Sequence, residues 1–149
     1  MSGTSTFAYV TFIRTTPEQL WSALTNPELT RQYWFGMYQL SHWTAGAPWQ
    51  LVFADGRIAD SGEVLESEPA RRLVLKWRNE FKPEMQAEGY SRCVIEIEPV
   101  GDVAKLSITH ALNQPDSRFV AAVSVGWPRI LSNLKSWLET GTVLFAEKF

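Results

Sequence analysis

The sequence has little of what marks secreted, membrane-spanning or nucleic-acid-binding proteins. Its one cysteine, Cys93, can form no internal disulfide, and a single free thiol fits a reducing cytoplasm, where we expect the protein to act. No apolar run approaches the roughly 20 residues that span a bilayer, and the N-terminal residues lack the pattern of a secretory signal. The formal net charge is −2 and the longest basic run is Arg71-Arg72, so we expect neither membrane insertion nor a nucleic-acid partner.

The sequence also lacks the motifs of metal, phosphate and hydrolase chemistry. The two histidines, His42 and His110, lie far apart, and no cluster of Cys and His has the spacing of a metal site. There is no glycine-rich phosphate loop, no GxSxG and no convincing pair of catalytic carboxylates. We therefore expect no cofactor and no metal, we identify no catalytic residue, and nothing establishes an enzyme.

Aromatic residues, in contrast, are abundant. The chain of 149 residues contains seven Trp, eight Phe and four Tyr. Its length suggests one domain over residues 1–149. Aromatic side chains fill hydrophobic cores and also line ligand pockets, so this composition is compatible with both.

The N-terminal third predicts a strand followed by two short helices. Residues 7–14 are rich in β-branched and aromatic side chains, which favours a strand. Thr16 suits a helix N-cap, with Pro17 in the first turn and Gln19 placed to complete a capping box. Asn26 precedes a proline, so it should end this helix and cap a second that runs toward residue 34.

The rest of the sequence predicts strands and one long helix. Alternating segments at 49–54, 57–66, 73–77, 92–98 and 103–112 read as strands, with the longer connections at 34–48 and 78–89 as loops. Near the C-terminus an apolar stripe recurs at helical spacing, with Pro128 in the first turn and Gly141 as the stop. Its members are Trp127, Ile130, Leu131, Leu134 and Leu138. An α+β fold follows, in which an antiparallel sheet of about six strands carries the helix on one face.

Two tight turns allow the strand register to be predicted. A two-residue turn at Gly101-Asp102 pairs Ile95 with Ile108 and Cys93 with His110. A similar turn at Asp55-Gly56 pairs Leu51 with Asp60, Trp49 with Gly62 and Phe53 with Ile58. The inner face is then apolar and aromatic, with three exceptions: Asp60, Cys93 and His110. Apolar walls with a few polar groups are typical of a small-molecule pocket.

Each of these exceptions has a second interpretation. His110 is either a polar anchor for a ligand or a core residue satisfied by a carbonyl or a water. Cys93 is either a nucleophile paired with His110 or a small buried hydrophobe, since no third orienting group is identifiable. Asp60 either anchors a ligand or points to water at the edge of the sheet, or else the hairpin contains a bulge.

Four stretches resemble one known family in the same order along the chain. They are FIRTTPEQLWSALTNPELTRQYW, GEVLESEPARRLVLKW, SRCVIEIEPVGDVAKLSITH and GWPRILSNLKSWLETG. Together they are similar to the SRPBCC superfamily, also called START-like or helix-grip proteins, in the branch named after the activator of the heat-shock-protein-90 ATPase. The resemblance implies a curved antiparallel sheet gripping the C-terminal helix around a hydrophobic cavity. Family members bind lipids, polyketides, hormones and other apolar molecules, and no catalytic motif is common to all of them.

The sequence thus favours a module that binds a hydrophobic, possibly aromatic, small molecule between sheet and helix. Asp60 and His110 would anchor it, and Tyr33, Trp34, Phe35 and Trp43 would form the mouth. A cyclase or hydrolase using Asp60 or His110 is one alternative. The other is a stress-related chaperone contact or a homodimer, for which the segment YWFGMY offers an apolar patch. The expected binding residues are Trp34, Trp49, Leu51, Phe53, Ile58, Asp60, Leu75, Trp77, Cys93, Ile95, Ile108, His110, Trp127, Leu131 and Leu134.

Overall fold

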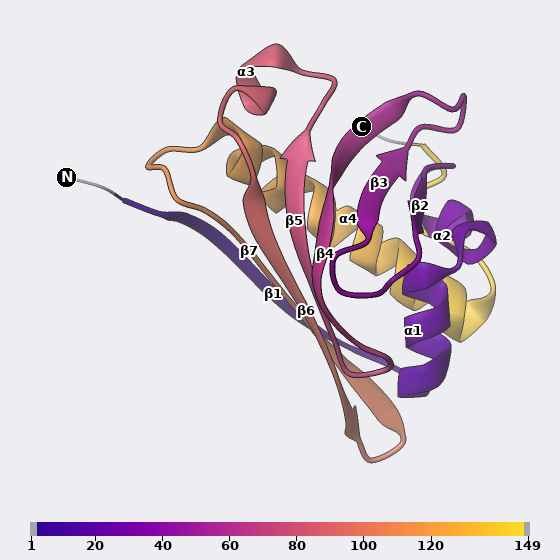
Figure 1. The fold of residues 1–149 in the computed structure, drawn as a ribbon. Helices are drawn as coiled ribbons and strands as arrows, with labels where there is room; N and C mark the ends of the chain where they lie inside the picture. Colours follow the sequence, from indigo (N-terminus) through magenta and orange to yellow (C-terminus); the bar gives the residue numbers. More distant parts are fainter. Residues whose placement is uncertain (1–2, 148–149) are drawn as a thin grey trace.

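The computed structural model describes residues 3–147, which form an antiparallel sheet and four helices (Figure 1). The seven strands lie in the order β1-β7-β6-β5-β4-β3-β2. The predicted α+β class, with two short helices after the first strand and a long C-terminal helix packed on the sheet, is confirmed. The elements are β1 (Ser5–Ile13), α1 (Pro17–Thr25), α2 (Pro27–Tyr33), β2 (Tyr38–Ser41), β3 (Pro48–Val52), β4 (Ile58–Glu68), β5 (Arg72–Asn79), α3 (Pro83–Gln86), β6 (Ser91–Val100), β7 (Val103–Leu112) and α4 (Arg118–Thr140).

The helix boundaries follow the capping residues. The side chain of Thr16 accepts a hydrogen bond from the Gln19 amide at 3.1 Å, and that of Asn26 accepts one from the Glu28 amide at 3.0 Å. Asn26 is both the C-cap of α1 and the N-cap of α2, as predicted. Gly141 ends α4 with φ of 85°, a left-handed conformation that glycine adopts without strain. The capping box is incomplete, because the Gln19 side chain accepts from the Thr15 hydroxyl instead.

The predicted strand register holds in full for one hairpin and in part for the other. In β6 and β7, Ile95 pairs with Ile108 and Cys93 with His110. In β3 and β4, Leu51 pairs with Asp60, but a bulge after Leu51 shifts the next pair. Ile58 therefore pairs with Val52, and the predicted pairing with Phe53 is wrong. The shift leaves Ile58 at the surface, where the residue is 45% exposed.

Three elements differ from the sequence prediction. The predicted loops hold a short edge strand, β2, and a single helical turn, α3. Helix α4 begins at Arg118, well before the predicted start, so Pro128 lies inside it and its assignment to the first turn is wrong. Asn133, expected on the polar face, is buried, and its side chain holds the residues that follow α4. The earlier start of α4 matters most, because it adds further helical turns to the interface with the sheet.

The hydrophobic core lies between the sheet and α4, and α1 and α2 extend it at one end. In Figure 1 the first half of α4 lies near α3, and its second half lies near α1 and α2. Gly62 of β4 pairs with Trp49 on one side and Trp77 on the other. Since glycine has no side chain, the two indoles meet there, with ring centroids 4.3 Å apart. Large aromatic rings thus occupy the middle of the sheet.

Candidate ligand-binding hollow

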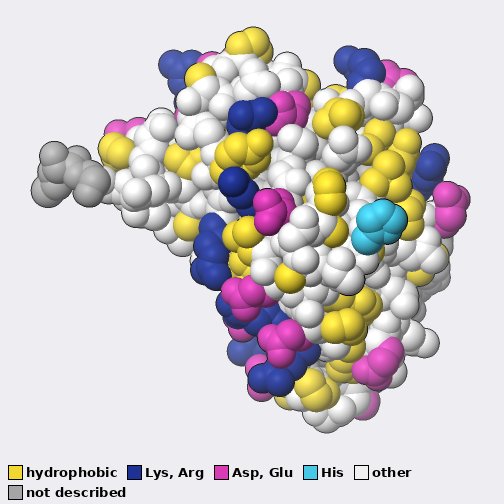
Figure 2. All heavy atoms as spheres, in the orientation of Figure 1, with side chains coloured by type: hydrophobic (Ala, Val, Ile, Leu, Met, Phe, Trp, Pro, Cys, Tyr) yellow, Lys and Arg dark blue, Asp and Glu magenta, His cyan; other side chains and the backbone are white. Residues whose placement is uncertain are grey.

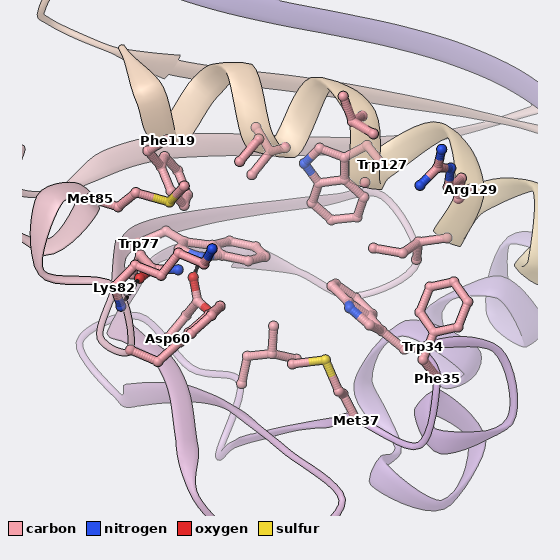
Figure 3. Close-up of a pocket in the computed structure, with 18 residues that line it drawn as sticks. Trp34, Phe35, Met37, Asp60, Trp77, Lys82, Met85, Phe119, Trp127 and Arg129 are labelled. Atoms are coloured by element: carbon pink, nitrogen blue, oxygen red, sulfur yellow. Dashed lines mark hydrogen bonds between the residues drawn. The ribbon is translucent and has the colours of Figure 1, made fainter. Parts of the chain in front are cut away.

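A hollow of about 370 Å³ lies between the first half of α4 and the sheet (Figure 3). Its remaining walls come from the segment after α2 and from the loop that contains α3. Most of the lining side chains are apolar. The lining residues are Trp34, Phe35, Met37, Leu51, Asp60, Trp77, Asn79, Phe81, Lys82, Met85, Phe119, Ala122, Val123, Val125, Gly126, Trp127, Arg129 and Ile130.

Three indoles form a continuous aromatic wall. The ring of Trp34 lies 5.3 Å from that of Trp127 and 6.5 Å from that of Trp77, and the last two lie 5.8 Å apart. Trp127 meets both partners edge to face, an arrangement that aromatic quadrupoles favour. At the rim, Phe81 and Val125 are 41% and 54% exposed. Apolar surface therefore continues from the wall to the opening.

The polar side chains of β4, β5 and the α3 loop gather at one end of the hollow. Asp60 is buried, and its Oδ2 accepts a hydrogen bond of 2.6 Å from Trp77 Nε1. Its strand partner is Asn79, whose Oδ1 accepts from the Lys82 amide at 2.9 Å. Figure 3 shows Asp60 and Lys82 beside Trp77, at the end away from Trp34 and Phe35. This end offers a carboxylate, an amide and an ammonium group, so it suits a polar group on an otherwise apolar molecule.

His110 lies outside the hollow, behind its wall. Its Nδ1 accepts a hydrogen bond of 3.1 Å from Trp127 Nε1, and its Nε2 lies 2.8 Å from Ser91 Oγ. Burial lowers the pKa of His110 from 6.5 to about 3, so the imidazole is neutral at physiological pH. With both nitrogens bonded and no exposed surface, His110 is suited neither to anchor a ligand nor to act as a base.

Cys93 faces His110 across the hairpin, as predicted, but it is fully buried and does not line the hollow. Burial raises the pKa of its thiol far above the ordinary value, so the reactive thiolate is suppressed. The sequence offered two interpretations of Cys93, and this environment supports the one in which Cys93 is a small buried hydrophobic residue.

The structure brings only part of the expected site to the hollow. Trp34, Leu51, Asp60, Trp77 and Trp127 line it. The expected mouth is there only in part, since Trp34 and Phe35 line the hollow and Tyr33 and Trp43 do not. Phe53 packs against Phe81 near the rim, with ring centroids 5.1 Å apart. The other expected residues fill the core, apart from the exposed Ile58; they are Trp49, Leu75, Cys93, Ile95, Ile108, His110, Leu131 and Leu134.

Sequence reasoning missed two walls of the hollow. The first turns of α4 contribute Phe119, Val123 and Gly126, which fall before the helix start that the apolar stripe predicted. Ser117 could have located that start, because its hydroxyl accepts from the Val120 amide as an N-cap. The loop after β5 contributes Phe81 and Met85, and its many polar residues concealed these two apolar side chains.

The described residues contain neither a grouped set of metal ligands nor a helix suited to span a membrane. Within residues 3–147, no group of three or more His, Cys, Asp or Glu side chains is arranged to hold a metal ion. None of the described helices has both the length and the apolar character needed to cross a membrane.

Comparison with known proteins identifies the family. The model of the family described as "Activator of Hsp90 ATPase homolog 1-like protein" matches residues 14–139, which is most of the chain. The chain belongs to this family. The resemblance inferred from four sequence stretches is thereby confirmed. Among curated protein sequences, none matches the chain at a significant level.

Solved structures of this fold come from diverse organisms. A crystal structure of a Mesorhizobium loti protein superposes with a TM-score of 0.77 and 24% identity, covering 91% of this chain and 97% of the other. The Aha1 dimer from Colwellia psychrerythraea gives a TM-score of 0.74 at 18% identity, covering 92% and 98%. An Hsp90 activator from Plasmodium falciparum gives 0.73 at 22% identity, covering 90% and 96%. At these identities the likeness shows the shared fold.

Proposed function

We propose that this protein binds a small, largely apolar molecule in the hollow between α4 and the sheet. The observation that carries the proposal is the hollow itself, about 370 Å³ in volume and walled by Trp34, Trp77 and Trp127. Small-molecule sites span about 300–1,000 Å³ and are mostly apolar with a few polar groups. The hollow has this size and composition.

The distribution of polar groups supports an amphipathic ligand. Its apolar body would lie against the three indoles, and its polar end would lie near Asp60, Asn79 and Lys82. The Asp60 carboxylate accepts from the Trp77 indole, and a carboxylate can accept several hydrogen bonds, so it also suits a donor group on a ligand. The ligand would be held mainly by apolar contact and oriented by the polar end.

The other roles considered have less structural support. A cyclase or hydrolase that uses His110 would need that side chain in the hollow, but His110 lies outside it with both ring nitrogens bonded. Of the two residues named for such chemistry, only Asp60 lines the hollow, where it accepts a hydrogen bond from Trp77. A chaperone contact through YWFGMY would need that segment exposed, but Tyr33, Trp34 and Met37 are buried and Phe35 is half-buried. A homodimer is documented by name for the Colwellia relative, and the same arrangement for this chain would be tested by its mass in solution.

A fluorescent probe tests the proposal. N-phenylnaphthylamine is a neutral molecule made almost entirely of aromatic rings. We expect the neutral probe to bind in a one-to-one ratio and Val123→Trp, which fills part of the hollow, to weaken it at least about tenfold. Val10→Trp on the exposed surface of β1 is the matched control and should bind as the wild type does. Equal binding by both variants would contradict the proposal.

A further inference from the structure

His110 lies directly behind three of the aromatic side chains that wall the hollow. Its ring centroid is 5.0 Å from that of Trp77, 5.1 Å from that of Phe119 and 6.3 Å from that of Trp127. The histidine itself has no exposed surface. A ligand in the hollow would touch these three aromatic side chains but not the imidazole that they share as a neighbour.

The hydrogen bonds of His110 determine its tautomer. An indole N–H can only donate, so the Nδ1 atom that receives it from Trp127 carries no proton. The proton of the neutral ring is then on Nε2, which donates to Ser91 Oγ. Ser91 in turn donates to the carbonyl of Trp77 at 2.8 Å. The chain of donors therefore runs in one direction, from α4 through β7 and β6 to β5.

The same chain joins the aromatic wall to the polar end of the hollow. Trp77 is held at two points, since its carbonyl accepts from Ser91 and its indole donates to Asp60. Trp127 is held at its indole nitrogen by His110. Directional bonds of this kind fix the angle of a ring more narrowly than apolar packing does.

We propose that His110 is a positioning residue that fixes the Trp127 indole and thereby determines the size of ligand that the hollow accepts. This inference rests on the proposed function. Without His110, the indole N–H would be buried without a partner and the ring would turn to find one. The hollow would then lose its defined wall, and its discrimination between ligands of different size would fall.

The test compares two neutral probes of different size, N-phenylnaphthylamine and naphthylamine, on matched variants. His110→Phe keeps a ring of similar size but removes both hydrogen bonds. His110→Gln keeps one acceptor and one donor and is the rescue variant. Leu134→Ala destabilises the core away from the hollow and controls for general loss of stability.

We expect His110→Phe to change the ratio of the two dissociation constants by roughly three- to tenfold, which corresponds to the net free energy of one lost hydrogen bond. His110→Gln should restore much of the ratio, and Leu134→Ala should leave it unchanged. An unchanged ratio in His110→Phe, with normal binding by the wild type, would overturn the role of His110 and leave the proposed function standing. Failure of the wild type to bind either probe would overturn the proposed function itself.

A measurement on the wild type stands even if His110→Phe does not fold. Nitrogen NMR should show His110 with its proton on Nε2 and unchanged between about pH 8 and about pH 5. Trp127→Phe removes the same hydrogen bond from the other side and should alter the probe ratio in the same direction. A proton on Nδ1, or a Trp127→Phe variant with the wild-type ratio, would overturn the inference.

Discussion

The two halves of α4 cover the sheet in different ways. In the second half, called the sealed half below, Leu131 and Leu134 are buried in a filled core beside α1 and α2. In the first half, called the open half below, Phe119, Gly126 and Trp127 border the hollow. Both halves present apolar side chains to the sheet, so the apolar stripe alone does not distinguish a filled interface from a hollow one.

The difference lies in how the side chains are held. Leucine side chains in a core sit in favoured rotamers and interdigitate closely with their neighbours, which gives the sealed half its dense packing. The indoles of the open half are rigid, and hydrogen bonds to Asp60 and His110 fix two of them. Rings that are held in this way cannot collapse into the space beside them, so the hollow persists.

The two halves also differ in what closes them. The residues after α4 fold back over the sealed half, where Asn133 Oδ1 accepts from the amides of Leu144 and Phe145 at 3.0 and 2.8 Å. The open half is covered by the α3 loop, which is exposed over most of its length. On the face drawn in Figure 2, apolar side chains are scattered among charged groups, and neither positive nor negative side chains form a broad patch of one sign.

Truncation at the sealed half should give the largest effect on stability. Leu134→Ala removes a side chain with no exposed surface and is expected to lower the free energy of unfolding by about 2–5 kcal/mol. Val125→Ala, at the rim of the open half, should change it by less than about 0.5 kcal/mol. Urea unfolding of both variants measures the contrast. Similar losses at the two positions would mean that the halves are packed alike.

The open half should be sensitive to acid through His110. The unfolded chain binds a proton at His110 near pH 6.5, but the folded chain binds it only near 3. Stability is therefore complete above about pH 6.5 and falls by about 1.4 kcal/mol per pH unit below it, or about 2 kcal/mol by about pH 5.

Urea unfolding of wild type and His110→Gln at these two pH values tests this expectation. The variant should lose most of the pH dependence in that window, because the position no longer titrates. His42→Gln replaces the other, exposed histidine and should keep the wild-type dependence. A pH dependence that persists in His110→Gln would place its origin elsewhere and remove the predicted contrast between the halves.

The α3 loop should depend on Glu88, which ties it to the start of α4. Its carboxylate accepts from Ser117 Oγ at 2.6 Å and from the amides of Arg118 and Phe119 at 2.9 and 3.3 Å. Partial burial raises the pKa of Glu88, but these hydrogen bonds outweigh it and the pKa lies below its usual value. Its contribution to stability is present above the pKa of the unfolded chain and is lost as the pH falls through the lower, folded value.

Glu88→Gln should therefore lower the free energy of unfolding by about 1 kcal/mol near neutral pH, as the loss of a charged helix cap does. The difference from wild type should shrink as the pH falls through the lowered pKa of Glu88 in the folded protein, because the carboxylate is then protonated. Glu84→Gln in α3 is the matched control and should behave as the wild type. A pH-independent loss in Glu88→Gln would contradict the assigned role of the charge.

The sequence was most informative where local chemistry decides the structure. Tight turns set the pairing of Ile95 with Ile108, and capping residues set the ends of α1 and α2. The hairpin of β3 and β4 was less predictable, because the bulge after Leu51 depends on tertiary packing and is not encoded in the turn that follows it.

The position of His110 illustrates the same limit for the candidate site. Its strand register was predicted correctly, and so was its inward orientation. Whether it faces the hollow or lies behind Trp127 depends on how α4 crosses the sheet, which the apolar stripe does not specify. The sequence therefore identified the right layer of the protein but not which of its residues a ligand would reach.

Gly126 within α4 and Gly141 at its C-cap offer the smallest expected effects and a direct comparison of the two ends of the helix. A Cβ added at Gly126 would meet only Ile130 Cδ1 at 4.0 Å, so alanine fits there and the helix gains about 0.5–1 kcal/mol. Gly141 has φ of 85°, where alanine is strained and should cost about 1 kcal/mol. Chemical denaturation of Gly126→Ala and Gly141→Ala should thus give changes of opposite sign.

Probe binding decides what the glycine in the open half is for. Because Gly126 lines the hollow, its new methyl group should weaken N-phenylnaphthylamine binding while it stabilises the helix. Gly141→Ala should leave binding unchanged, since that residue lies at the far end of α4 and does not line the hollow. A stabilised Gly126→Ala that binds as well as wild type would show that this position is open space without a binding role. A stabilised variant that binds less well would mean that the native sequence forgoes helix stability at Gly126 to keep the hollow open.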